Sequence, residues 1–301
     1  MLTLFALPKP FLGHINVIQR NALNSWIRLV PSCQILLFGN EEGTSEIAHE
    51  FGIQHISYVA KNEFGTPLVN DLFSKAQQIA IFPIMCYVNS DIILMNDFMK
   101  AITIIDSWNS NFLAIGRSWN LKHENQLDFN QSDWCIRLHD LLLEKNCELR
   151  EPWATEYFVF HRYFYQNLPP FALGRAYFDN WLIWKARSQK AFVVDITFYA
   201  SVIHQLHDYS HVPGGILWAH RGDEAINNVK LSGGLSRRYC IFDATHYLLK
   251  SGIKRNFIHK LRWRMIKILK DRLWYYFLDK TRPVRSHLGL RMSSLKKLLN
   301  I

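Results

Sequence analysis

The sequence has 301 residues, a hydrophobic fraction of 49%, an aromatic fraction of 14% and a formal net charge of +10. This length is sufficient to bury one large core or two modest ones, and the apolar content excludes an intrinsically disordered chain. Five cysteines without a C-x-x-C spacing give neither a zinc signature nor a disulfide framework, so we expect a reducing compartment.

The positive charge is confined to the C-terminal end of the chain. Residues 251–301 hold 14 Lys and Arg against two Asp and Glu, whereas residues 1–250 hold 21 against 23. We therefore expect one nearly neutral domain over 1–250, followed by a basic helical extension over 251–301. Residues 1–10 lack the basic segment of a signal peptide, and no apolar run reaches the roughly 18 residues of a spanning helix. These features favour a cytoplasmic protein.

Strand-like and helix-like patterns alternate along the first part of the chain. Continuous apolar runs predict buried strands at 2–7, 33–39, 54–60, 84–94 and 111–119. Helical spacing predicts helices between them at 15–29, 44–51, 66–80 and 96–108. Residues suited to helix starts predict where three helices begin: Thr44 or Ser45, Pro67, and Asn96 or Asp97. The alternation is typical of an α/β fold with a Rossmann-like, mostly parallel sheet flanked by helices.

The second half continues this pattern. Residues 151–165 and 192–195 predict strands, and residues 168–190 predict a loop that leads into a helix beginning at Asp179. The pair Gly214-Gly215 and the polar stretch 218–228 predict a mobile loop that folds over a bound ligand.

Polar side chains follow several predicted strands, at the edge where α/β sheets bind their ligands. Asn89, Ser90 and Asp91 interrupt the fourth apolar run, where a buried carboxylate needs a partner. Glu41 follows the second strand, and Arg117 lies near the end of the fifth. Taken alone, Asp91 also fits a turn or a helix cap. Because carboxylates suit Mg²⁺ or Mn²⁺ and these ions bridge phosphates, the edge predicts a phosphorylated ligand bound with a divalent metal.

The stretch Tyr87–Leu94, YVNSDIIL, resembles the short acidic motif, often D-x-D, of glycosyltransferases with the GT-A fold. The resemblance covers about residues 1–245, and no P-loop or dinucleotide fingerprint competes with it. It implies that the motif holds a divalent cation against the diphosphate of a nucleotide-sugar, with a UDP-sugar favoured. The first acid of the motif is Asn89 here, so the resemblance assigns metal binding mainly to Asp91.

The resemblance also implies further donor contacts. It places polar residues of the helix before the motif, and an acid after the second strand, beside the nucleotide. With the polar residues at the sheet edge, the donor-binding set is Glu41, Asn70, Lys75, Asn89, Ser90, Asp91 and Arg117.

An acid at a helix start in the second half is the general base of inverting GT-A enzymes, so the resemblance assigns this role to Asp179. Capping of the helix explains Asp179 equally well. Trp181 and Trp184 follow it and fit either the protein core or an aromatic surface for a sugar.

Three histidines lie within eight residues, at positions 204, 207 and 211. A solvated or structural cluster accounts for this spacing, but some GT-A enzymes add a C-terminal histidine to the metal shell. The resemblance therefore implies His207 or His204 as a further ligand, with His220 in reserve.

The tail has an amphipathic pattern. An apolar stripe runs from Ile258 to Tyr276, and most basic residues lie opposite it. Residues 253–301 therefore fit an anionic membrane surface, and the stripe equally fits packing on the domain. Nucleic-acid binding is the weaker alternative, because no recognised module accompanies the charge.

These observations predict a metal-dependent, inverting glycosyltransferase that moves a sugar from a nucleotide-diphosphate donor to a hydroxyl acceptor, such as a glycan or a lipid-linked molecule. The alternatives are a sugar-nucleotide nucleotidyltransferase and a non-catalytic carbohydrate- or nucleic-acid-binding module. The first alternative expects a glycine-rich phosphate loop near the N-terminus, and residues 8–21 contain one glycine.

Overall fold

A computed structural model describes residues 2–108, 110–207 and 215–256. Nine of the described strands form one sheet in the order β12-β11-β9-β6-β8-β4-β1-β2-β3. Their bounds are β1 Leu2–Ala6, β2 Gln34–Phe38, β3 Gln54–Ile56, β4 Ile84–Val88, β6 Phe112–Ile115, β8 Tyr157–His161, β9 Phe192–Asp195, β11 His246–Leu249 and β12 Gly252–Arg255. All neighbouring pairs are parallel except those made by β8 and β12. The predicted α/β fold with a mostly parallel sheet is confirmed.

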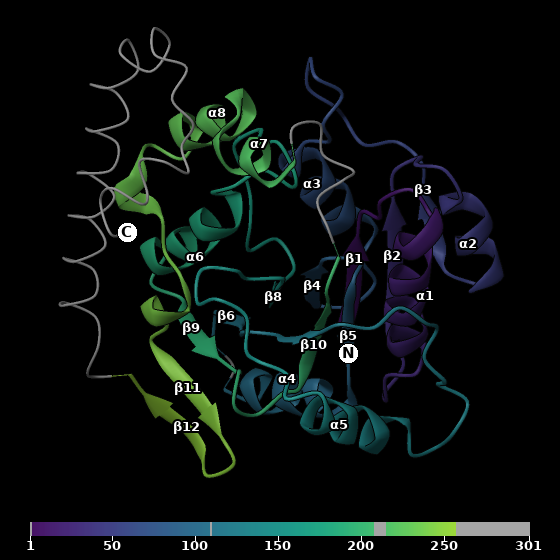
Figure 1. Ribbon diagram of the computed structural model, residues 1–301. Coiled ribbons are helices and arrows are strands. Elements are labelled where there is room, and N and C mark those ends of the chain that lie inside the picture. The colour runs from purple at the N-terminus through teal and green to yellow at the C-terminus, as the bar shows by residue number, and fades with distance from the viewer. Residues whose placement is uncertain (1, 109, 208–214, 257–301) are drawn as a thin grey trace, which may run out of the picture. The chain divides into compact units, whose positions relative to one another are not determined.

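Helices cover both faces of this sheet (Figure 1). On one face, α1 (Gly13–Ile27), α2 (Thr44–Glu50) and α4 (Asn96–Asp106) share a core with the even-numbered residues of β1, among them Leu2 and Leu4. On the other face, α3 (Val69–Ile79) and α6 (Phe178–Ser188) pack around Phe5. Alternate residues of a strand point to opposite faces, so β1 contributes to both cores, and this explains its continuous apolar sequence.

A second, smaller sheet has the order β5-β10-β7. Its strands are β5 (Ile92–Leu94), β7 (Trp119–Leu121) and β10 (Val202–Gln205), and β5 pairs antiparallel with β10. The predicted strand 84–94 is therefore two strands, β4 and β5, which belong to different sheets. Asn89, Ser90 and Asp91 form the crossing between them.

The helix α5 (Trp134–Glu144) was not predicted, and it packs on the smaller sheet through Leu138 and Leu142. The predicted mobile loop at 218–228 is wrong, because the helices α7 (Gly215–Arg221) and α8 (Asp223–Leu231) occupy this segment. Two short 3₁₀ helices, η1 (Leu235–Arg237) and η2 (Ile241–Asp243), follow.

The predicted helix caps are also wrong. The N-cap of α2 is Gly43, whose φ of 81° is left-handed. A Cβ added to Gly43 would lie 2.9 Å from the Phe11 Cβ, so the position also has no room for a side chain. The N-cap of α4 is Met95. The side chain of Asp97 instead accepts a hydrogen bond from the Ser201 N–H at 2.9 Å, which ties α4 to the smaller sheet.

Two further boundaries differ from the predictions. Pro67 does not lie in the first turn of α3, because it forms a β-bridge with Lys61 and the helix begins at Val69. The predicted domain boundary at residue 250 falls inside the β11–β12 hairpin, since β12 pairs with β11 at the edge of the main sheet. The rest of the predicted tail, 257–301, lies outside the described residues. None of the described helices is long and apolar enough to cross a membrane.

Candidate functional site

Asp91 lies at the carboxyl end of β4, where the chain crosses to the smaller sheet. The register of that sheet places His204 opposite Ile92, the residue after Asp91. The backbone carbonyl of Asp91 also accepts a hydrogen bond from the Gln205 side chain at 3.0 Å. Two segments more than 100 residues apart are thereby held together, and this brings the predicted acidic motif beside the predicted histidines.

Asp91, His204 and His207 form one cluster. The His207 Nε2 lies 2.8 Å from the Asp91 Oδ2, and the His204 Nε2 lies 3.6 Å from the same oxygen. One ligand atom from each residue lies within 4.8 Å of the other two. The second oxygen, Asp91 Oδ1, is buried and has no hydrogen-bond partner among the described residues. A carboxylate oxygen and two imidazoles fit a divalent cation, which would satisfy the orphaned oxygen. His211, the third histidine, lies outside the described residues.

The cluster favours the forms of these side chains that bind metals. Burial alone would raise the pKa of Asp91, but the His207 hydrogen bond and the nearby His204 and Lys9 hold it well below its ordinary range. Burial lowers the pKa of His204, against the opposing effect of Asp91. Asp91 is therefore an anion and His204 is neutral near pH 7, as metal ligands must be.

Lys9 belongs to the site, although it was not among the predicted residues. Its Nζ lies 3.0 Å from the His207 Nε2. The buried Gln19 side chain holds the Lys9 backbone with bonds of 2.7 and 2.8 Å and accepts a hydrogen bond from Ser90 at 2.8 Å. Lys9 follows the carboxyl end of β1. Polar residues after strand ends were the basis for predicting Glu41 and Asp91, so the same criterion could have indicated Lys9.

Asn89 and Glu156 are joined by hydrogen bonds at the carboxyl end of β4. Asn89, at the position where the D-x-D pattern has its first acid, donates its side-chain N–H and its backbone N–H to Glu156. Glu156 precedes β8, which lies next to β4 in the sheet. A second carboxylate therefore lies beside Asn89, supplied by another strand.

Arg150 links Glu156 to His204. Its Nε lies 2.8 Å from the Glu156 Oε1, and its Nη1 lies 2.8 Å from the His204 Nδ1. The Asn120 Oδ1, from β7, lies 3.2 Å from the same histidine nitrogen. Neither Arg150 nor Glu156 follows a predicted strand end, so no signal in the sequence indicated them.

Asp179 lies in the first turn of α6, as predicted. Burial raises the pKa of Asp179 to about 6, and Glu156 contributes in the same direction. The backbone N–H of Asn180 and the positive charge of Arg238 act against this shift. The carboxylate therefore titrates close to neutral pH, which suits a group that accepts a proton.

Tyr87 shows that Asp179 and Asp91 face the same region. Burial raises the pKa of the Tyr87 phenol, and the carboxylates of Glu156, Asp91 and Asp179 raise it further. Its hydroxyl donates a hydrogen bond of 2.9 Å to the Asn89 Oδ1. The carboxylates of all three acids thus act on one buried phenol at the carboxyl end of β4.

Three of the other predicted donor residues have local partners. Lys75 forms an ion pair with Asp71 at 2.8 Å, and Glu41 pairs with Lys61 at 3.3 Å. The guanidinium of Arg117 donates to two backbone carbonyls at 2.6 and 3.1 Å, which fixes the loop before β8. Among the residues that the structure describes, the buried Asn70 Oδ1 has no hydrogen-bond partner.

The two predicted aromatic residues of α6 differ in their surroundings. Trp181 is buried in the core, where its ring centroid lies 5.2 Å from that of Phe171. Trp184 is partly buried under the guanidinium of Arg237, 4.4 Å from the ring centroid. Trp181 therefore cannot stack on a sugar. His220, the reserve ligand, lies on the exposed side of α7.

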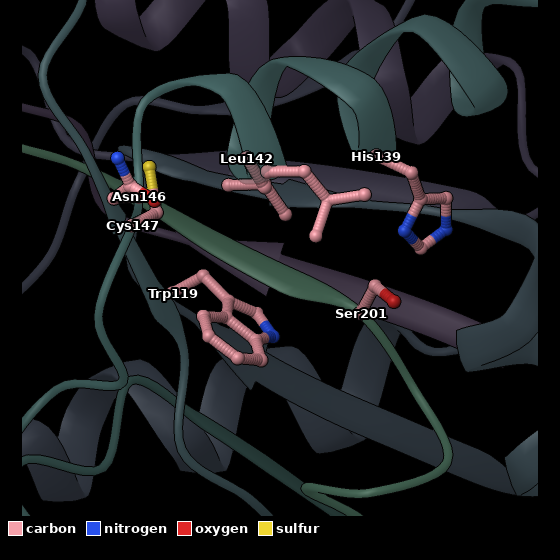
Figure 2. Close-up of a pocket in the computed structure, with 7 residues that line it drawn as sticks. Trp119, His139, Leu142, Asn146, Cys147 and Ser201 are labelled. Carbon is pink, nitrogen blue, oxygen red and sulfur yellow. The ribbon is translucent and has the colours of Figure 1, made fainter.

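A cavity of about 450 Å³ lies between α5 and the smaller sheet (Figure 2). Trp119 lies along one side, Leu142 faces it from α5, and Ser201 and His139 lie at one end. Asn120, the neighbour of Trp119 on β7, contacts His204 in the Asp91 cluster. Neighbouring residues of a strand point to opposite faces, so the cavity lies behind the sheet that carries His204 and is separate from the cluster.

No protein-family model matches the chain, and no curated protein is similar to it in sequence. Among solved structures, the glucosyl-3-phosphoglycerate synthase from Mycobacterium tuberculosis is 13% identical with a TM-score of 0.46, over 78% of this chain and 80% of that one. The S. aureus TarS 1-349 structure is 14% identical with a TM-score of 0.33, over 43% of this chain and 40% of that one.

Proposed function

We propose that this protein is a nucleotide-sugar-dependent glycosyltransferase whose donor site is built around Asp91. The observation that carries the proposal is the convergence of Asp91, His204 and His207 at the carboxyl end of β4, with the buried Asp91 Oδ1 unsatisfied among the described residues. Ligands of open α/β sheets bind at this edge. The alternative of a turn or capping residue does not explain why two histidines converge on Asp91.

Asp91 and His207 would hold a divalent cation, with His204 completing the protein ligands. Two imidazoles favour Mn²⁺ over Mg²⁺, because Mg²⁺ prefers oxygen ligands in nearly ideal octahedral geometry. When bound, the cation neutralises charge on the diphosphate that leaves the sugar. A UDP-sugar is our favoured donor.

Asp179 acts as the general base in this proposal. The acceptor hydroxyl oxygen attacks the anomeric carbon, the bond from that carbon to the diphosphate breaks, and Asp179 takes the hydroxyl proton. The nucleoside diphosphate leaves and the anomeric configuration inverts. A pKa of about 6 leaves the Asp179 carboxylate deprotonated at neutral pH while it remains basic enough to accept the proton.

We propose that the basic residues 257–301 bind anionic membranes, which suits a lipid-linked or surface-exposed glycan as the acceptor. The enzyme would then act as a peripheral protein on the cytoplasmic face of a membrane.

Calorimetric titration of UDP with and without Mn²⁺ tests the donor site. We expect UDP to bind with Mn²⁺ and to bind at least about tenfold more weakly in EDTA, because a cation held by Asp91 and the histidines would neutralise charge on the diphosphate. Asp91→Ala should remove the difference between the two conditions. Asp106→Asn, which neutralises an exposed carboxylate at the end of α4, is the matched control and should behave as the wild type. UDP binding that ignores both Mn²⁺ and Asp91 would contradict the proposal.

A further inference from the structure

Each imidazole of the Asp91 cluster contacts a cationic side chain. The Lys9 Nζ lies 3.0 Å from the His207 Nε2, and the Arg150 Nη1 lies 2.8 Å from the His204 Nδ1. Lys9 and Arg150 thus place two positive charges beside the negative charges of Asp91 and Glu156.

The contacts of His207 cannot all be satisfied at once. The His207 Nε2 lies 2.8 Å from the Asp91 Oδ2 and 3.0 Å from the Lys9 Nζ. This nitrogen donates to Asp91 when it carries a proton, and it accepts from Lys9 only when it does not. A metal ion needs the same unprotonated lone pair. Lys9 and a divalent cation therefore compete for the His207 Nε2.

Lys9 is the cation that can move away. Its backbone is fixed by the two bonds to Gln19, but its side chain is a flexible four-carbon stem that is only partly buried. Displacement by a metal at the His207 Nε2 would therefore move the Lys9 ammonium group.

We propose that Lys9 is a diphosphate-binding residue that occupies the metal position until the donor binds. This inference rests on the proposed donor site. A divalent cation bound with a nucleoside diphosphate adds net negative charge beside Lys9. The displaced ammonium group would lie beside the new phosphate oxygens and donate charge-assisted hydrogen bonds to them.

The inference predicts effects of opposite sign in one variant. Lys9→Met keeps the apolar stem and removes the competing charge, so Mn²⁺ alone should bind more tightly, by roughly 3- to 10-fold. UDP in saturating Mn²⁺ should bind more weakly, by about 10- to 100-fold, because a charge-assisted hydrogen bond is lost. Binding of uridine, which has no phosphate, should not change.

Mn²⁺ and UDP titrations of the wild type, Lys9→Met and Lys9→Arg test the inference. Lys9→Arg should keep most of the UDP affinity. Lys100→Met, the same change on the exposed surface of α4, should leave both affinities unchanged. Equal melting temperatures of the variants would show that each is folded.

Two results would overturn the inference. If the wild type binds UDP with Mn²⁺ but Lys9→Met changes neither affinity, or weakens both, the exchange at His207 does not occur and the donor site still stands. If the wild type shows no Mn²⁺-dependent UDP binding, the proposed function fails and the inference fails with it.

Discussion

Replacing Asp179 by Asn should make the protein more stable and less active. The pKa of Asp179 is raised from its ordinary value of 3.8 to about 6, mainly because burial disfavours the charged form. This difference corresponds to about 3 kcal/mol that the folded state loses when the carboxylate ionises. Asn keeps the shape and the oxygen that accepts from the backbone, but it cannot carry the charge. We therefore expect Asp179→Asn to raise the free energy of unfolding by roughly 1–3 kcal/mol at pH 7.5.

The pH dependence of this gain follows from the direction of the shift. The folded wild type binds more protons than the unfolded chain between about pH 4 and pH 6, so its stability falls as the pH rises through this range. Above pH 6 the penalty is complete, and near pH 4 it is absent. The stability difference between Asp179→Asn and the wild type should therefore shrink towards zero as the pH falls to 4.

Urea unfolding at pH 7.5 and pH 4.5, together with turnover at pH 7.5, measures both effects. Turnover should fall about 10²–10⁴-fold, because a positioned general base usually contributes this factor to the rate. The UDP affinity in Mn²⁺ should stay nearly unchanged. Asp106→Asn is the control for removal of an exposed carboxylate. A variant that is less stable than the wild type at pH 7.5, or that loses UDP binding in parallel with turnover, would refute the assignment of Asp179 as a general base whose charged form is destabilised by burial.

Three further predictions concern the ligands, the ion pair and the tail. His207→Ala should weaken Mn²⁺ binding by about tenfold or more in calorimetry, because a protein ligand is lost; unchanged affinity would remove His207 from the metal site. Glu156→Gln should lower the free energy of unfolding by about 2–4 kcal/mol in urea titrations, because the buried charge of Arg150 loses its negative partner. An unchanged free energy of unfolding would show that water solvates Arg150 in the variant. A protein that ends at residue 256 should keep UDP binding but lose salt-sensitive binding to anionic liposomes, to which each basic residue near the surface contributes about 1 kcal/mol. Liposome binding that survives the truncation would contradict the membrane proposal.

The sequence predicted the parallel sheet well, because buried strands in such sheets are continuous apolar runs. The same property hid the break between β4 and β5. The run from Ile84 to Leu94 is apolar on both sides of Asn89–Asp91, so nothing in the pattern indicates that its two ends join different sheets. The helix α5 was missed although its buried residues Trp134, Leu138 and Leu142 recur every four positions, which is the spacing of one helix face. The segment after Gly215 was predicted as a loop from its glycines and polar residues, and tertiary packing overrode this local preference.

The candidate site was predicted only where residues follow strand or helix ends. Asp91 and Asp179 could be selected in this way, and the histidines came from the resemblance to GT-A enzymes. Arg150 and Glu156 reach the site through the antiparallel strand β8, whose place beside β4 is a property of the sheet and not of the local sequence. The contacts of Lys75 with Asp71 could have been predicted, since residues four apart on a helix are neighbours.

The most direct test of the account is release of UDP from a panel of UDP-sugars by the wild-type protein, measured with Mn²⁺ and with EDTA. Water can replace the acceptor hydroxyl as the attacking group when no acceptor is present, so we expect UDP release from at least one sugar nucleotide in Mn²⁺. That release should disappear in EDTA and in Asp91→Ala. A panel that stays intact under all conditions, or a release of UDP that is the same in EDTA and in Asp91→Ala, would contradict the assignment of a metal-dependent glycosyltransferase.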